Sequence, residues 1–188
     1  MMRYAKALRK LFEGARFNAS DLLLLESFQV GYLPDRVPKM EFATLIRRYP
    51  HIKDFLVMKN PSISAFLDSI LKTHEEITDS ELIAEYCEEA LWEIADLVLY
   101  NKHPELYDKQ IRFNWEMDEI IGREMLKGKV VADVGAGSGK LALLLAKYAE
   151  TVYAIEPISS FRTFIKQRVA QNKISNLFVM DGFLESIQ

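Results

Sequence analysis

The sequence has little of what disulfide-bonded, metal-binding or strongly basic proteins depend on. Cys87 is the only cysteine, so no disulfide can form within the chain. His51, His74 and His103 have no HxxxH spacing and no cysteine cluster beside them, which argues against a metal site. The net charge of -3 gives no excess of positive charge that would favour nucleic acid or an anionic membrane. We therefore expect a cytoplasmic chain without a bound metal.

Long hydrophobic runs are also absent. The apolar stretch in DLLLLESF is far shorter than the roughly 20 residues that span a bilayer, so we expect no membrane segment. With 188 residues, 49% of them hydrophobic and 27% charged, the chain can form one large or two small domains with a core. Cys87 lies at helical spacing with Ile83, Leu91 and Ile94, which indicates a buried thiol rather than a nucleophile.

Residues 1–128 have the pattern of a helical domain. Apolar residues recur there every three or four positions, and prolines such as Pro50 and Pro61 divide the segment into about six helices. A capping box is predicted from Thr78 and Glu81, and one long helix from Pro104 to a left-handed C-cap at Gly128. The segment 75–96 holds nine carboxylates and no lysine or arginine, which favours a solvated helix face over a site for a basic partner.

Residues 129–188 have a different pattern, in which short apolar runs alternate with helical ones. KVVADVG, TVYAIEP and NLFVMDG are predicted strands, with helices over GKLALLLAKYA and SSFRTFIKQRVAQN between them. This alternation predicts an α/β fold with a doubly wound parallel sheet. Ligands bind beyond the carboxyl ends of such strands, where Asp133, Glu156 and Asp181 lie.

Three glycines occupy the first turn between strand and helix. At Gly135, Gly137 and Gly139 the missing Cβ allows positive φ and a close approach of a ligand to the main chain. A dinucleotide fingerprint requires a small residue three positions after its second glycine, where this chain has Lys140. The phosphate-binding motif GxxxxGK[ST] is absent as well, since Leu141 follows Lys140.

The order DVGAGSG, AIEP and MDG resembles the class I (Rossmann-like) methyltransferases that use S-adenosyl-L-methionine. The resemblance covers Val130 to about Phe183, roughly the first half of that family's domain. It implies a helical domain, residues 1–128, followed by an incomplete cofactor domain, residues 129–188, whose elements follow the order β-α-β-α-β along the chain. It also implies S-adenosyl-L-methionine as the cofactor.

The resemblance also implies roles for individual residues. Asp133 would face the ammonium group of the cofactor, Glu156 would accept from both ribose hydroxyls, and Asp181 would accept from the adenine amino group. The remaining residues implied to line the cofactor are Gly135, Ala136, Gly137 and Gly139 at the methionine moiety, and Pro157, Ile158, Gly182 and Phe183 at the adenine.

The chemistry of the three carboxylates agrees with these roles and leaves alternatives. An ionised carboxylate only accepts hydrogen bonds, so Glu156 suits a vicinal diol and would repel a 2'-phosphate. The alternative for Glu156 is an exposed charge at a strand end. Asp133 could instead cap the next helix or bond the loop amides, and Asp181 could form a turn before Gly182.

Three residues ahead of the first strand are candidates for a cofactor lid. Members of this family often cover the cofactor from that segment, which here contains Tyr107, Arg112 and Trp115. Arg112 could pair with the methionine carboxylate, and Trp115 could shield the sulfonium. The alternative is that Trp115 belongs with Ile111 to the apolar stripe of a helix.

No catalytic residue is identified by the sequence. In this family the residues for substrate and catalysis usually follow a fourth strand, and this chain offers three, the first of them as an apolar edge. We therefore expect the N-terminal, truncated part of a larger methyltransferase, with little turnover alone and a methyl acceptor of unspecified class. By analogy, the helical domain contributes to the acceptor site or to a homodimer. An NAD-dependent oxidoreductase and a non-catalytic helical interaction module are the alternatives.

Overall fold

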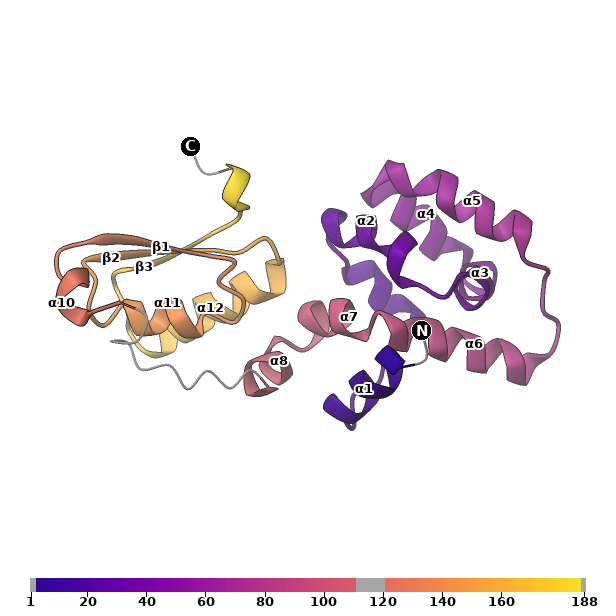
Figure 1. Ribbon diagram of the computed structural model, residues 1–188, viewed down its shortest axis with the longest axis horizontal. Helices are drawn as coiled ribbons and strands as arrows, with labels where there is room; N and C mark the ends of the chain where they lie inside the picture. The colour runs from indigo at the N-terminus through magenta and orange to yellow at the C-terminus, as the bar shows by residue number, and fades with distance from the viewer. Residues whose placement is uncertain (1–2, 111–120, 187–188) are drawn as a thin grey trace. The chain divides into compact units, whose positions relative to one another are not determined.

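The computed structural model describes residues 3–110 and 121–186 (Figure 1). The chain divides between Lys102 and His103 into a helical unit and a sheet unit. Residues 103–110 and 121–128, which we expected in the helical domain, therefore group with the sheet. The packing of α8 (Pro104–Gln110) against α12 (Ser159–Gln171) explains this grouping.

The helical unit consists of short helices that begin and end at prolines and caps. Pro61 is the first residue of a helical turn, as the sequence predicts. Pro50, which the sequence predicts only as the end of a helix, follows the end of α3 (Lys39–Arg48) and is also the first residue of α4 (Pro50–Lys59). No helix within residues 3–110 and 121–186 is long and apolar enough to cross a membrane. The elements are α1 (Arg3–Leu11), η1 (Ala19–Leu24), α2 (Ser27–Arg36), α3 (Lys39–Arg48), α4 (Pro50–Lys59), η2 (Pro61–Ile63), α5 (Ser64–Thr73), α6 (Ser80–Glu93) and α7 (Ala95–Lys102).

The predicted capping box at Thr78 is wrong by one residue. The N-cap of α6 is Asp79, whose Oδ1 accepts from the amides of Glu81 at 2.8 Å and Leu82 at 3.0 Å. An aspartate satisfies these first-turn amides with a charged acceptor, which also interacts favourably with the helix dipole.

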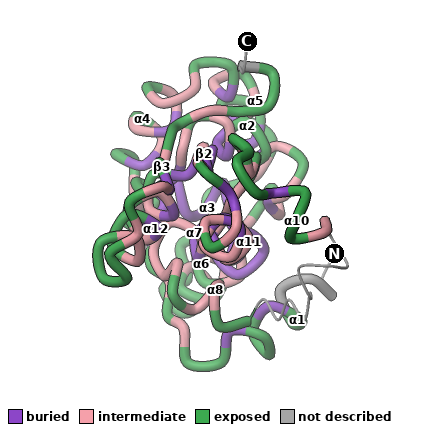
Figure 2. Tube along the Cα trace, turned by 90° about the vertical axis from the view of Figure 1, so that its left-hand side faces the viewer, coloured by how far each residue is buried: buried purple, intermediate pink, exposed green. Residues whose placement is uncertain are grey.

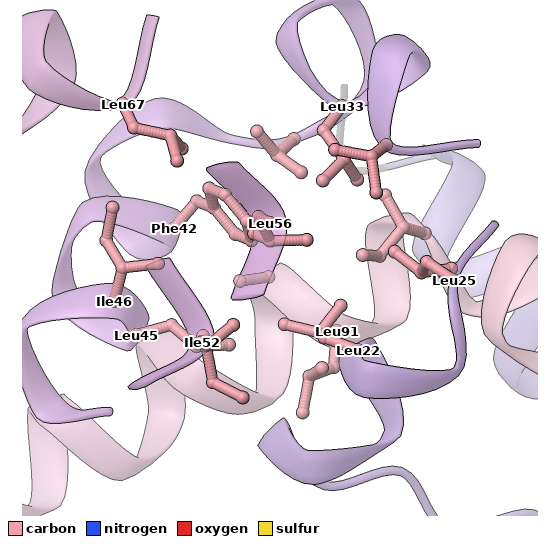
Figure 3. Packing of buried hydrophobic residues seen from close by; sticks show 14 of the residues in the cluster. Leu22, Leu25, Leu33, Phe42, Leu45, Ile46, Ile52, Leu56, Leu67 and Leu91 are labelled. Atoms are coloured by element: carbon pink, nitrogen blue, oxygen red, sulfur yellow. The ribbon is translucent and has the colours of Figure 1, made fainter. Parts of the chain in front are cut away.

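A single cluster of leucine, isoleucine and phenylalanine side chains holds the helical unit together (Figure 3). Phe42 and Leu45 of α3 are fully buried, as are Ile52 and Leu56 of α4 and Leu22 of η1. Each of these short helices contributes only a few core residues, so their stability comes from packing against one another rather than from helix propensity.

The acidic segment 75–96 is paired within the chain. Arg9 of α1 donates to Glu88 at 2.7 Å and Glu89 at 3.2 Å. Arg36 of α2 donates to both carboxylate oxygens of Asp96, at 2.8 and 2.9 Å. These ion pairs join α1 and α2 to the acidic segment, so part of its charge is neutralised inside the helical unit rather than by solvent.

The sheet unit has the predicted alternation of strands and helices. The bounds are α8 (Pro104–Gln110), α10 (Arg123–Leu126), β1 (Val130–Val134), α11 (Lys140–Leu145), β2 (Thr151–Ile155), α12 (Ser159–Gln171), β3 (Leu177–Met180) and η3 (Leu184–Ser186). The predicted long helix from Pro104 to Gly128 is interrupted, because Ile121 and Gly122 are not helical. Gly128 has the predicted left-handed conformation, with φ +67°.

The three strands form one parallel sheet in the order β1-β2-β3. Figure 1 shows α11 and α12 on the same face of this sheet. On the opposite face Val130 is 65% exposed and Phe178 50% exposed, and β2 holds the most buried strand positions (Figure 2). Asp133 lies opposite Ala154 in the register, so its side chain is on the helix-covered face.

A buried position and an exposed one in the helical unit should respond differently to truncation. We expect Phe42→Ala to lower the free energy of unfolding by about 3–5 kcal/mol, because it leaves a cavity in a fully packed cluster. Met58→Ala, at a side chain that is 73% exposed, should change it by less than about 0.5 kcal/mol. Urea unfolding followed by circular dichroism measures both, and equal losses would contradict the core assignment.

Candidate functional site

The turn between β1 and α11 requires its glycines. Gly135, Gly137 and Gly139 have φ of +74°, +55° and +79°, which side chains rarely tolerate. The amides of Gly135 and Ala136 both donate to the carbonyl of Ile155, at 2.8 and 3.1 Å. The turn is therefore fixed to the carboxyl end of the neighbouring strand, β2.

The three glycines differ in their surroundings. A Cβ on Gly139 would lie 2.7 Å from Cγ1 of Ile165, so this glycine lets the start of α11 approach α12 closely. A Cβ on Gly137 would lie 3.7 Å from the Tyr107 ring, and one on Gly135 would meet nothing within 4 Å. Gly139 thus has a packing role, while Gly135 leaves open space beside the main chain.

Glu156 follows β2 directly and is only 4% exposed. Its Oε2 accepts from the amide of Gly137 at 2.7 Å, and its Oε1 accepts from the amide of Ile158 at 2.9 Å. The alternative of an exposed strand-end charge is therefore wrong. The carboxylate instead connects the glycine turn to the loop that leads into α12.

Asp133 lies next to the end of β1 and has one unpartnered oxygen. The backbone amide of Ala142, in the first turn of α11, lies near enough to stabilise the charged form of the carboxylate. Its Oδ2 is buried and has no hydrogen-bond partner within the described parts of the chain. Burial raises the pKa of Asp133, and the nearby Ala142 amide offsets part of this effect.

The charge of Asp133 disfavours the charged form of Glu156. Burial raises the pKa of Glu156, the hydrogen bonds from Ile158 and Gly137 and the charge of Arg162 lower it, and the nearby charge of Asp133 raises it further. A positive charge beside the buried Glu156 and the half-buried Asp133 would favour their ionised forms.

Tyr107 is the candidate lid residue that the structure describes. Its ring contacts Phe161, with centroids 4.9 Å apart, and lies beside the glycine turn. Burial raises the pKa of the Tyr107 hydroxyl, and the negative charge of Glu156 adds to the effect. Arg112 and Trp115 lie outside the described residues.

The end of β3 is more exposed than the end of β2. Pro157 is half-buried and Ile158 is buried, whereas Phe183 is exposed and the Asp181 side chain is 70% exposed. Asp181 accepts from Arg162 at 3.0 Å. The same guanidinium donates to the backbone carbonyl of Glu156 at 2.8 Å, so Arg162 connects the ends of β2 and β3.

Sequence reasoning missed a charged cluster that fixes α8 against the glycine turn. Asp108 accepts from Arg168 at 3.1 Å, and Lys140 donates to the backbone carbonyl of Asp108. Arg168 also donates to the carbonyl of Ser138 within the turn, at 3.2 Å. Asp108 and Arg168 are 60 positions apart and belong to no motif, so nothing in the sequence pairs them.

Replacing Asp133 by asparagine should change how stability depends on pH. The pKa of Asp133 in the folded protein lies above the ordinary value of 3.8, so the folded protein binds this proton more tightly than the unfolded chain does. The proton therefore adds to the free energy of unfolding at low pH, and this added stability is lost as the pH rises through the folded-state pKa. We expect Asp133→Asn to be more stable than the parent chain at neutral pH, with the difference shrinking toward pH 3.8. Urea unfolding across pH measures it. Asp54→Asn, at an exposed position, is the control, and a difference that does not vary with pH would contradict the assignment.

Two glycine-to-alanine variants separate the cost of the close contact at Gly139 from the cost of its positive φ. Gly128→Ala should cost about 1–2 kcal/mol, because its φ of +67° is unfavourable for alanine but a Cβ there meets nothing within 4 Å. Gly139→Ala should cost about 1–3 kcal/mol more, because its Cβ would overlap Ile165. Thermal and urea unfolding compare the two variants, and equal costs would show that the overlap relaxes freely.

Comparison with known proteins gives only partial similarity, and only to solved structures. No family model matches the chain, and no curated protein matches its sequence. The crystal structure of WT Trm5b from Pyrococcus abyssi is similar to 38% of the chain, with 29% identity and a TM-score of 0.34. The match covers 22% of that protein's chain. Functional interpretation therefore depends on the geometry around the glycine turn.

Proposed function

We propose that this chain carries the S-adenosyl-L-methionine-binding part of a methyltransferase. The observation that supports this most directly is the unpartnered Oδ2 of Asp133, a buried acceptor beside a glycine turn. Buried polar atoms nearly always have a partner, so an exception next to a turn that a ligand can approach indicates where a donor binds.

The acceptors present fit the polar groups of this cofactor. Asp133 would hold the ammonium group through Oδ2. Each oxygen of the Glu156 carboxylate accepts one loop amide and, with two lone pairs, retains capacity for a ribose hydroxyl. Gly135 would let the methionine moiety lie against the main chain, since no atom stands within 4 Å of the position of its missing Cβ.

Charge favours a cationic ligand over a dinucleotide. A pyrophosphate at this turn would meet Asp133 and Glu156, whose pKa values are already raised by burial. Lys140, the nearest candidate for a phosphate ligand in the turn, donates instead to the Asp108 carbonyl. S-adenosyl-L-methionine carries a positive ammonium and a positive sulfonium against one carboxylate, so it is a net cation, and its positive groups would reduce the repulsion between Asp133 and Glu156.

The remaining residues would enclose the adenine and the methionine moiety. Pro157, Ile158 and Phe183 would contact the adenine, with Asp181 accepting from its amino group. Tyr107 would cover the turn. When bound, the cofactor supplies a methyl group on a sulfonium, a good leaving group, so the protein's contribution is chiefly to orient it toward an acceptor.

Two adenosyl ligands that differ in the amino acid end test the role of Asp133. S-adenosylhomocysteine carries the ammonium group and methylthioadenosine lacks it. We expect Asp133→Asn to weaken binding of S-adenosylhomocysteine by about 10- to 100-fold, because a charge-assisted hydrogen bond is lost, and to leave methylthioadenosine unchanged. Isothermal titration calorimetry on the 188-residue chain measures both.

Glu156→Ala should abolish binding of both ligands, while Glu150→Ala, an exposed position just before the start of β2, should leave both intact. NAD serves as the competing ligand. Binding of NAD in preference to S-adenosylhomocysteine, or equal losses for both adenosyl ligands in Asp133→Asn, would overturn the proposed function.

A further inference from the structure

The helical unit contains a cavity of about 870 Å³ that the proposed cofactor site does not use. It lies between α1, the segment 15–19, the end of α3 and one face of α6, and all of its lining residues belong to the helical unit. A volume of this size is typical of sites for small organic ligands.

The lining of the cavity is basic and aromatic. Three arginines, Arg9, Arg16 and Arg48, line it together with a single carboxylate, Glu88. Arg9 is already engaged, since it pairs with Glu88 and lies over the Trp92 ring at 5.0 Å. Arg48 lies over the Tyr49 ring at 5.9 Å but, like Arg16, is not paired with a carboxylate among the described residues, so these two arginines determine what the cavity can attract.

Arg16 and Arg48 are exposed, and neither forms an ion pair with a carboxylate among the residues that the structure describes. The neighbouring Arg47 differs, because its guanidinium is committed to the backbone carbonyls of Leu71, His74 and Glu75. A guanidinium fork matches the oxygens of a phosphate, and two such groups at one cavity favour a multiply charged anion.

Aromatic side chains form the rest of the recognition surface. Phe17 and Tyr49 are half-buried at the cavity, and Phe17 packs edge-on against Trp92 with centroids 5.0 Å apart. Aromatic rings and arginine planes are the groups on which nucleobases stack. Asn18 and Ser80, which also line the cavity, supply hydrogen-bonding groups for a sugar or a base edge.

We propose that this cavity binds a nucleoside diphosphate, with its phosphates at Arg16 and Arg48 and its base at the aromatic side chains. Such a ligand combines a planar ring with a multiply charged anion. The proposal is independent of the proposed cofactor site, because the glycine turn belongs to the sheet unit.

Cys87 provides a probe inside the cavity. It lines the cavity and is the only cysteine in the chain. The sequence predicts a buried thiol, whereas the structure shows Cys87 half-buried. Burial raises the pKa of its thiol, and the positive charge of Arg48 lowers it. Alkylation by N-ethylmaleimide therefore reports access to this cavity alone, and its rate can be followed by mass spectrometry.

Uridine diphosphate is the ligand to test, because its base differs from the adenine of the proposed cofactor. At a concentration ten times its dissociation constant, we expect it to slow alkylation of Cys87 about tenfold, by the occupancy of the site. Uridine and inorganic diphosphate at the same concentration should slow it much less, because each supplies only half of the recognised groups.

Arg48→Ala and Arg16→Ala should each raise the uridine diphosphate concentration needed for protection by about tenfold or more. Lys39→Ala, which removes the same charge from an exposed position at the other end of α3, should leave it unchanged. Loss of Arg48 also changes the pKa of the Cys87 thiol and so the alkylation rate without ligand. For each variant we therefore compare the ratio of the alkylation rates with and without ligand. No protection by uridine diphosphate, equal protection in Arg48→Ala, or equal protection by inorganic diphosphate would overturn the proposal.

Discussion

The carboxylate of Glu156 is the interaction on which the candidate site depends. It accepts from Gly137 at 2.7 Å and from Ile158 at 2.9 Å, and so joins the turn after β1 to the loop after β2. Both amides belong to segments without a regular hydrogen-bonding partner, and a buried amide without an acceptor is costly. The carboxylate therefore adds a side-chain link between the two strand ends, beside the hydrogen bonds from the Gly135 and Ala136 amides to the Ile155 carbonyl.

The same arrangement makes the site unfavourable for its own charges. Glu156 is buried and Asp133 half-buried, each has a raised pKa, and one oxygen of Asp133 has no partner among the described residues. Such unmet requirements are typical of binding sites, where a ligand supplies what the protein lacks. Stability for the sheet unit comes instead from packing, for which Gly139 is essential because α11 approaches Ile165 so closely.

The three strands and the two helices between them could be predicted from the sequence because they follow from periodicity and glycine spacing. The site at the strand ends stays a prediction. β1, β2 and β3 all fall within the predicted runs. The ion pairs between distant residues could not be predicted, because no local pattern relates their positions. Examples are Asp108 with Arg168 and Arg162 with Asp181. The burial of Glu156 was also beyond prediction, because it depends on the turn folding back over the end of β2.

A titration of the glycine amides would test the account most directly, because the chain contains only eight glycines. In a ¹⁵N-glycine-labelled sample, we expect S-adenosylhomocysteine to shift the signals of Gly135, Gly137 and Gly182, at the ends of β1 and β3. Gly14 and Gly31 of the helical unit should stay in place. Unchanged signals from the glycine turn at saturating ligand, or shifts confined to the helical unit, would contradict a cofactor site at the ends of these strands.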